Sequence, residues 1–197
     1  SPPPRRPSPP PADRVSLKFA ILTSLTERAG SGIELARRFD RSIGYFWPAT
    51  HQQIYRGLDR LAPARLIREL PQEGPPRRGQ PRRFEVTPGG SELLVGWIGE
   101  GDEPDPMRST LAVRVRAAAA TGRTRELRHA LEHHRRRRQD DLDRYRQIEQ
   151  RDFRSVDPSD PRGTLQHRVL RLGIEGERAW LAWCDDTLAA LEGLPGD

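Results

Sequence analysis

The sequence Pro48-Ala49-Thr50-His51-Gln52-Gln53-Ile54-Tyr55-Arg56-Gly57-Leu58-Asp59-Arg60-Leu61 predicts a capped amphipathic helix, and the rest of the chain is arranged around it. Thr50 and Gln53 have the spacing of a capping box, so we expect the helix to begin near Thr50. Ile54, Leu58 and Leu61 recur at i, i+4 and i+7 and form a narrow apolar stripe that can pack on other helices.

The remaining side chains of this helix carry amide, phenol and guanidinium groups, which base edges and phosphates accept. An ordinary amphipathic helix with a solvated polar face would show the same pattern, so the neighbouring segments must decide between the two interpretations. The candidate DNA-contacting residues on this helix are Thr50, His51, Gln52, Gln53, Tyr55, Arg56 and Arg60.

Two short helices are expected before this one. From Ser16 an apolar face recurs at helical spacing and ends at Ala29-Gly30. Ser31 and Glu34 then form a second capping box that opens a helix with Ile33, Ala36 and Phe39 facing inward.

A basic hairpin and a fourth helix are expected after it. Residues 66–70 and 82–86 are strand-like runs separated by a loop rich in Pro, Gly and Arg, which predicts a two-stranded wing. Thr87-Pro88 supplies an N-cap and a first-turn proline for a helix whose apolar positions are Leu93, Leu94, Trp97 and Ile98. The arginines expected to contact phosphate or the minor groove are Arg77, Arg78 and Arg82.

The C-terminal half is predicted to be helical. Residues 107–120 form one helix, and apolar residues from Leu127 to Ile148 then recur at nearly heptad spacing, although Arg138 interrupts this seam. A last helix, from about Thr164 to Leu191, has a broad apolar face with too few partners in the chain to cover it. The residues expected to form a dimer interface are Leu165, Val169, Leu172, Trp180, Trp183 and Leu188.

Together these segments predict a fold that is mainly α with a small β-hairpin, namely a winged helix-turn-helix followed by a helical dimerisation domain. The expected bounds are 1–14 for a disordered Pro-rich tail, 15–99 for the DNA-binding domain and 107–197 for the C-terminal domain.

Charge supports a polyanionic partner for the first half. Residues 1–99 contain 16 Lys and Arg against 9 Asp and Glu, whereas residues 100–197 contain 18 against 19. The chain has one cysteine, Cys184, and no run of 18 or more apolar residues, which favours a soluble cytoplasmic protein without membrane contact.

No constellation of residues predicts an enzyme, a cofactor or a metal site. His133 and His134 are adjacent and therefore face different ways on a helix. Cys184 is expected to be a buried structural residue. The run Arg135–Arg138 could be a second nucleic-acid patch, but the aspartates that follow it favour ion pairs within the helix.

Several motifs make the chain resemble the PadR family of transcriptional regulators, over nearly all of its length after the tail. These are Leu17-Lys18-Phe19-Ala20-Ile21-Leu22, Phe46-Trp47-Pro48 through Arg56, Arg83 through Gly90, and Leu172 through Trp183, which is similar to the end of a longer, Vir-like subgroup. The resemblance implies a homodimeric winged-helix repressor that a small, often aromatic effector releases from DNA. In this chain Phe84 replaces a usual Tyr, and Ala64-Arg65 replaces a usual glycine turn.

We therefore expect a dimeric, sequence-specific regulator that binds a palindromic operator in double-stranded DNA. The alternative is a winged-helix module for protein interaction or scaffolding without specific DNA binding. Trp97, Trp180 and Trp183 are candidates for binding an aromatic effector, although they could simply fill the core.

Overall fold

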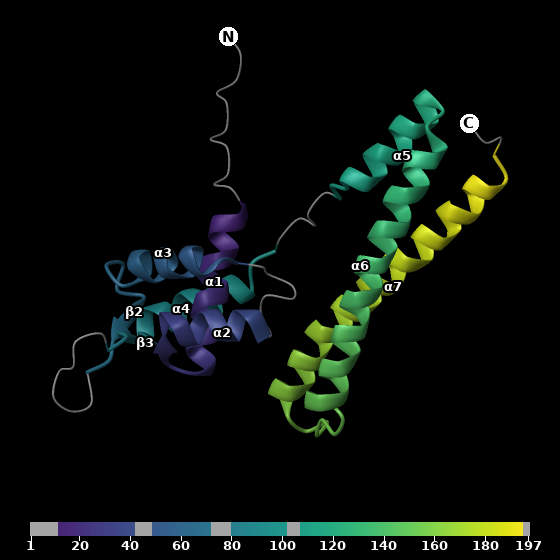
Figure 1. Cartoon of the computed structure of the whole chain (residues 1–197). Helices are drawn as coiled ribbons and strands as arrows, with labels where there is room; N and C mark the ends of the chain where they lie inside the picture. Colours follow the sequence, from purple (N-terminus) through teal and green to yellow (C-terminus); the bar gives the residue numbers. More distant parts are fainter. Residues whose placement is uncertain (1–11, 42–48, 72–79, 102–106, 195–197) are drawn as a thin grey trace, which may run out of the picture. The chain divides into compact units, whose positions relative to one another are not determined.

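The computed structural model describes residues 12–41, 49–71, 80–101 and 107–194. The chain divides into two compact units, Ser1–Glu103 and Pro104–Asp197, called unit 1 and unit 2 below. The fold is mainly helical with one small sheet, as predicted (Figure 1). Unit 1 contains α1 (Ala12–Glu27), β1 (Gly30–Ser31), α2 (Gly32–Arg41), α3 (His51–Leu61), β2 (Ile67–Glu69), β3 (Arg83–Val86) and α4 (Pro88–Ile98). The described helices of unit 2 are α5 (Thr110–Thr121), α6 (Thr124–Asp152) and α7 (Pro161–Glu192).

Helix α1 begins at Ala12, so the expectation of a tail that extends to residue 14 was wrong. The N–H groups of a helix's first turn have no hydrogen-bond partner within the helix, so the N–H that proline lacks is not needed there. The helix can therefore start directly after Pro11, the last proline of the run. The part of the tail before this point, residues 1–11, lies outside the described residues.

Helix α2 carries the predicted capping box. The Ser31 amide donates to Glu34 Oε2 at 2.7 Å, and the Glu34 amide donates to Ser31 Oγ at 3.3 Å. The hydrogen bond from the Ser31 backbone is the main cause that holds the pKa of Glu34 below its usual value. Ala36 and Phe39 are buried as predicted, and Leu35 is buried with them, whereas Ile33 is exposed. Ile33 and Leu35 are two positions apart, and helical residues at this spacing point to nearly opposite sides.

The sheet has three antiparallel strands in the order β1-β3-β2, with Phe84 paired to both Gly30 and Glu69. The predicted hairpin of β2 and β3 is confirmed, with shorter strands than expected. Strand β1 was missed, because two residues are too few to show a strand pattern. The wing loop, residues 72–79, lies outside the described residues.

Helix α4 closes the core of unit 1. The Gly90 amide donates to the hydroxyl of the N-cap Thr87 at 3.1 Å, as the Thr-Pro motif predicted. Leu94 is buried and Trp97 is half-buried, whereas Leu93 and Ile98 are exposed because α4 packs on α1 through a narrower stripe than expected. The core is formed by Phe19, Ile21, Leu22, Leu25, Leu35, Ala36, Phe39, Ile54, Leu58, Leu61, Ile67, Phe84 and Leu94.

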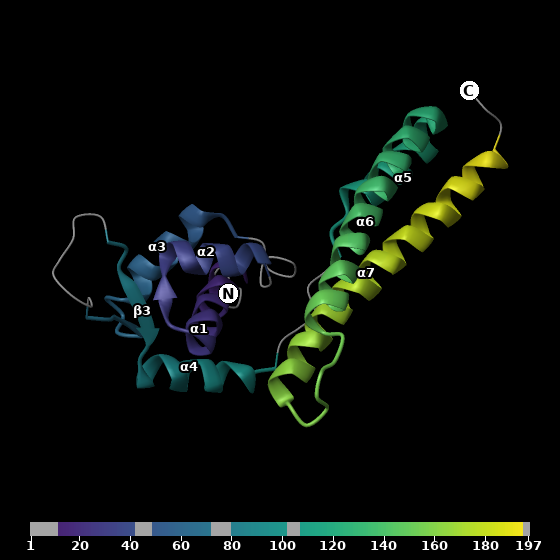
Figure 2. The same ribbon diagram turned by 60° about the horizontal axis from the view of Figure 1, so that its bottom comes forward.

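In unit 2, α6 and α7 run side by side, and α5 packs against the end of α6 that is remote from the α6–α7 turn (Figures 1 and 2). The predicted seam of α6 is buried, and Cys184 is buried as expected. The side chains of α7 that face inward are Leu170, Ile174, Glu177, Leu181 and Cys184.

The arginine that interrupts the seam is paired across it. Arg138 Nη1 lies 3.0 Å from Glu177 Oε1, and the Arg138 guanidinium lies 5.1 Å from the ring centroid of Trp180. Arg135 pairs with Asp185 on α7. The expectation that these arginines pair within α6 was therefore wrong, because Arg135 and Arg138 follow Leu131 at i+4 and i+7 and so face α7.

Candidate nucleic-acid interface

Helix α3 begins with the predicted capping box. The Gln53 amide donates to Thr50 Oγ1 at 3.2 Å, and the Thr50 amide donates to Gln53 Oε1 at 2.8 Å. Thr50 and Gln53 therefore set where the helix starts, and the Gln53 side chain keeps only its NH₂ group for other partners.

One face of α3 is buried and the opposite face is open. Ile54, Leu58 and Leu61 are at most 3% exposed, whereas Gln52, Arg56 and Arg60 on the other side are exposed. The exposed face thus presents one amide and two guanidinium groups, which are the groups that bind base edges in the major groove.

Two of the predicted DNA contacts lie on the flank of α3 that touches α2. The ring of Tyr55 covers Gly32, where an added Cβ would lie 2.3 Å from Tyr55 Cε1. His51 Nε2 lies 3.3 Å from Asp40 Oδ2. Both side chains remain exposed, but they also hold α2 and α3 together.

Gly57 explains how α1 and α3 approach each other. A Cβ at this position would lie 2.3 Å from Cδ1 of Ile21, which is fully buried. A glycine inside a helix costs about 1 kcal/mol relative to alanine. In α3 the missing side chain of Gly57 permits close packing on α1, and this packing orients the exposed face of α3.

Of the arginines at the wing, the described pair, Arg82 and Arg83, point to different helices. Arg82 Nη2 lies 3.4 Å from Asp59 on α3, and Arg83 Nη1 lies 3.8 Å from Glu34 on α2. Successive residues of a strand point to opposite faces, which separates the two guanidinium groups. Arg77 and Arg78 lie outside the described residues.

The turn after α3 has the left-handed conformation that glycine usually provides. Arg65 has φ 57°, the one positive φ of a non-glycine residue in the described part of the chain. Its carbonyl accepts a hydrogen bond of 2.7 Å from the Thr87 hydroxyl, which ties the end of α3 to the start of α4.

Lys18 is a basic residue at this interface that the sequence did not single out. It lies on α1 beside the flank of α3 that carries Gln53, Arg56 and Arg60. No motif or spacing within α1 relates Lys18 to residues of another helix, so only the packing of α1 on α3 reveals it.

Helix α7 carries a second apolar stripe that nothing described in the chain covers. Leu165 and Leu172 are 65% and 71% exposed, and Val169 is also exposed. The stripe continues through Gly176, whose missing Cβ would meet no atom within 4 Å. Leu188, in contrast, packs on the cluster that joins α5, α6 and α7, and half-buried Trp183 also touches this cluster.

The three tryptophans proposed for an effector are divided between the units. Trp97 is stacked on Phe19 in unit 1, with ring centroids 4.2 Å apart. Trp180 and Trp183 lie on α7 in a T-shaped pair at 5.6 Å, and Trp180 also contacts His134.

The described residues contain no group of three or more metal-ligating side chains. No described helix is long and apolar enough to cross a membrane.

The arrangement of unit 1 defines the winged helix-turn-helix class. It combines three helices, a three-stranded sheet with a hairpin, and an exposed polar face on the third helix.

Comparison with known proteins places the chain within this class. Residues 107–192 match the family described as virulence activator alpha C-term. Over 190 residues the chain is 38% identical to Rv1176c of Mycobacterium tuberculosis, described as a probable transcriptional regulator, with 90% of this chain and 98% of the relative covered. The chain belongs to the PadR-like transcriptional regulators that carry this C-terminal domain, a non-enzymatic family.

Solved structures show the same fold. The virulence activator AphA of Vibrio cholerae matches with a TM-score of 0.77 and 24% identity, over 91% of this chain and 99% of that one. Bacillus subtilis PadR in complex with operator DNA matches with a TM-score of 0.77 and 21% identity, over 89% and 99%. The structure of the same protein in complex with p-coumaric acid matches with a TM-score of 0.73 and 22% identity, over 94% of this chain and 99% of that one.

Proposed function

We propose that this regulator is a homodimeric repressor that binds a palindromic operator through α3. The observation that carries the proposal is the exposed face of α3, where Gln52, Arg56 and Arg60 stand opposite the buried stripe. B. subtilis PadR, which shares the fold, has been solved in complex with operator DNA.

The side chains of this face have distinct expected roles. Gln52 suits adenine and Arg56 suits guanine, because their paired hydrogen-bonding groups match those base edges in the major groove. Arg82 pairs with Asp59 and Glu69 through exposed contacts at 3.4 and 3.8 Å, which are weak enough for a phosphate to replace. Arg77, Arg78 and Arg82 are expected to contact phosphate or the minor groove.

Dimerisation is assigned to unit 2. Leu165, Val169 and Leu172 recur at i, i+4 and i+7 and remain exposed, and Gly176 further along the same stripe lets another helix approach closely. A second copy that covers this stripe would give the dimer two α3 helices, one for each half-site of a palindrome, and such half-sites lie about 34–36 Å apart on successive major grooves.

Release by a small aromatic effector completes the proposal. B. subtilis PadR has been solved in complex with p-coumaric acid, and Trp180 and Trp183 provide half-buried aromatic surface in unit 2 of this chain. Since coupling is reciprocal, an effector that weakens operator binding must itself bind more weakly to the operator complex.

The decisive test is operator selection by Gln52→Ala and Arg56→Ala, measured by fluorescence anisotropy with duplexes varied at single positions. Each variant should lose about 1–3 kcal/mol of discrimination at one base pair. Arg37→Ala, on the exposed side of α2, is the matched control and should leave base preference unchanged. Unaltered preference in both α3 variants would show that α3 is not the reading helix, and affinity that does not depend on salt would favour the protein-interaction alternative.

Dimerisation is tested separately by sedimentation. Leu172→Glu places a charge in the middle of the exposed stripe and should shift the chain towards monomer. Ala182→Glu, also exposed on α7 but on a different side of the helix, is the control. An unchanged dimer in Leu172→Glu would exclude this stripe from the interface.

A further inference from the structure

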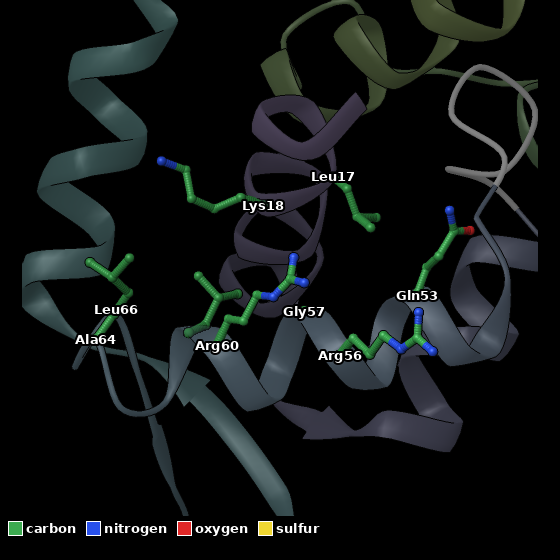
Figure 3. A pocket seen from close by; sticks show the side chains of 9 residues that line it. Leu17, Lys18, Gln53, Arg56, Gly57, Arg60, Ala64 and Leu66 are labelled. Atoms are coloured by element: carbon green, nitrogen blue, oxygen red, sulfur yellow. The ribbon is translucent and has the colours of Figure 1, made fainter. Parts of the chain in front are cut away.

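A hollow of about 400 Å³ lies between α1 and α3 in unit 1 (Figure 3). Its size falls within the range of roughly 300–1,000 Å³ that small-molecule sites occupy. Nothing in the proposed reading of DNA by α3 requires a hollow of this kind. It is lined by Leu17, Lys18, Gln53, Arg56, Gly57, Arg60, Leu61, Ala64 and Leu66.

The polar side of the hollow carries an excess of positive charge. His51 and Asp59 of α3 have partners of opposite charge in Asp40 and Arg82. Lys18, Arg56 and Arg60 form no ion pair with the described residues of the chain. Three cations around one hollow, without carboxylates, attract an anion.

The hollow also has an apolar wall. Leu61 is buried, and Leu17 and Leu66 are half-buried. Gly57 also lines the hollow, at the point where its missing side chain lets Ile21 of α1 pack closely on α3. A bare phosphate needs only the cations, whereas cations facing an apolar wall fit a ligand that is anionic at one end and apolar at the other.

We propose that this hollow binds a small organic anion with an apolar body, such as an aromatic carboxylate. In Figure 3 the guanidinium of Arg60 rises from α3 towards α1, with Lys18 on one side of it and Arg56 and Gln53 on the other. Arg60 can hold a carboxylate through two parallel N–H···O bonds. Lys18 and Arg56 raise the positive potential on either side, and the apolar body packs on Leu61 and the leucines beside it.

Such a ligand would compete directly with operator DNA. Arg56 and Arg60 belong to the exposed face of α3, and this consequence alone rests on the proposed function. In direct competition the apparent operator Kd rises with ligand concentration without limit. An effector bound elsewhere would instead change the operator Kd only up to a fixed coupling factor.

The test is calorimetric titration of the full chain with three probes. 1-Naphthoate has both the anion and the apolar body, 1-naphthol has the body without the carboxylate, and inorganic phosphate has only the anion. We expect naphthoate to bind at the hollow, with the other two probes binding there about tenfold more weakly or worse, since a charged hydrogen bond contributes about 1.5–3 kcal/mol.

Variants locate the site. Lys18→Gln should weaken naphthoate binding about fivefold, whereas Arg28→Gln, which removes the same charge from an exposed position directly after the end of α1, should not. Ala64→Leu narrows the hollow from an exposed position and should abolish binding while the circular dichroism spectrum stays native. The proposal would be overturned if neither Lys18→Gln nor Ala64→Leu changed the affinity for naphthoate. It would also be overturned if 1-naphthol bound as tightly as naphthoate.

Operator binding measured without ligand separates this proposal from the proposed function. If the operator is bound but naphthoate is not, the hollow is no anion site and the regulator assignment stands. If naphthoate binding responds to the variants as expected but no operator is bound, the site stands and the DNA-reading role of α3 fails.

Discussion

The two units bury their apolar residues in different ways. In unit 1, four helices and two strands all contribute side chains to one closed core, from Phe19 on α1 to Leu94 on α4. In unit 2, α6 and α7 bury one stripe against each other, while Leu165 and Leu172 on α7 stay more than 60% exposed.

The difference follows from the shape of the elements. Short helices that cross around a sheet can enclose a core, whereas two long helices side by side can each cover only one face of the other. Unit 1 therefore has the core of a self-sufficient domain, whereas unit 2 leaves an apolar stripe of α7 uncovered by the described residues. Five substitutions, grouped into four predictions, test this contrast between the units.

Arg138→Ala should have the largest effect, because its ion pair with Glu177 lies inside the helical seam of unit 2. Removing one partner leaves Glu177 buried without its counter-ion and should cost about 3 kcal/mol, the low end of the usual range because the Arg138 side chain is 28% exposed. Hydrogen exchange should quicken in α6 and α7 and stay unchanged in unit 1. The control Arg135→Ala breaks the exposed pair with Asp185 and should cost less than about 1 kcal/mol.

Gly90→Ala tests the close packing of unit 1. Its Cβ would lie 2.1 Å from the Leu66 carbonyl oxygen, so α4 must move and the thermal stability of unit 1 should fall by about 2 kcal/mol. The neighbouring Gly89→Ala meets its nearest atom at 3.9 Å and should stabilise the helix by up to about 1 kcal/mol. Equal melting temperatures for the two variants would contradict the packing of α4 on Leu66.

Arg65→Gly should stabilise unit 1 by roughly 0.5–1 kcal/mol. The left-handed conformation of Arg65 costs a non-glycine residue about 1–2 kcal/mol, and the greater freedom of glycine in the unfolded chain offsets part of the gain. Ala64→Gly is the control, since Ala64 is not left-handed, and it should not raise the melting temperature. A fall in stability for Arg65→Gly would mean that its side chain contributes more than its backbone costs.

The smallest effects are two opposite pH dependences. The pKa of Glu34 is lowered by the Ser31 amide, so its contribution to stability is present above the unfolded pKa of about 4.3 and is lost as the pH falls through the lower folded value. Burial raises the pKa of Glu177, although Arg138 opposes the shift, so its contribution is largest below the unfolded pKa and is lost as the pH rises through the folded value.

Urea denaturation between about pH 3 and 7 measures both. The stability difference between wild type and Glu34→Gln should shrink in acid, and that between wild type and Glu177→Gln should change in favour of wild type in acid. The same sign for both variants would contradict the different surroundings of the two carboxylates.

The sequence predicted the features that depend on near neighbours in the chain. The caps at Thr50, Ser31 and Thr87 are contacts over three residues, and all three form as expected. The stripe of α3 was also predicted correctly, since helical periodicity alone places Ile54 and Leu58 on one face. The DNA contacts proposed for the opposite, exposed face of α3 remain predictions.

Other features needed the packing of segments far apart in the chain. Arg138 and Glu177 are 39 residues apart, and the registration of α6 against α7 brings them together. Lys18 joins Arg56 and Arg60 around one hollow because Gly57 lets α1 approach α3. The prediction that Ile33 faces inward was wrong because α2 is short and its apolar residues are compatible with more than one buried face. Only the packing of the other elements on α2 decides which face is buried. Local hydrogen bonds and periodicity thus determined the elements, and the contacts between elements decided which charges are buried, paired or free.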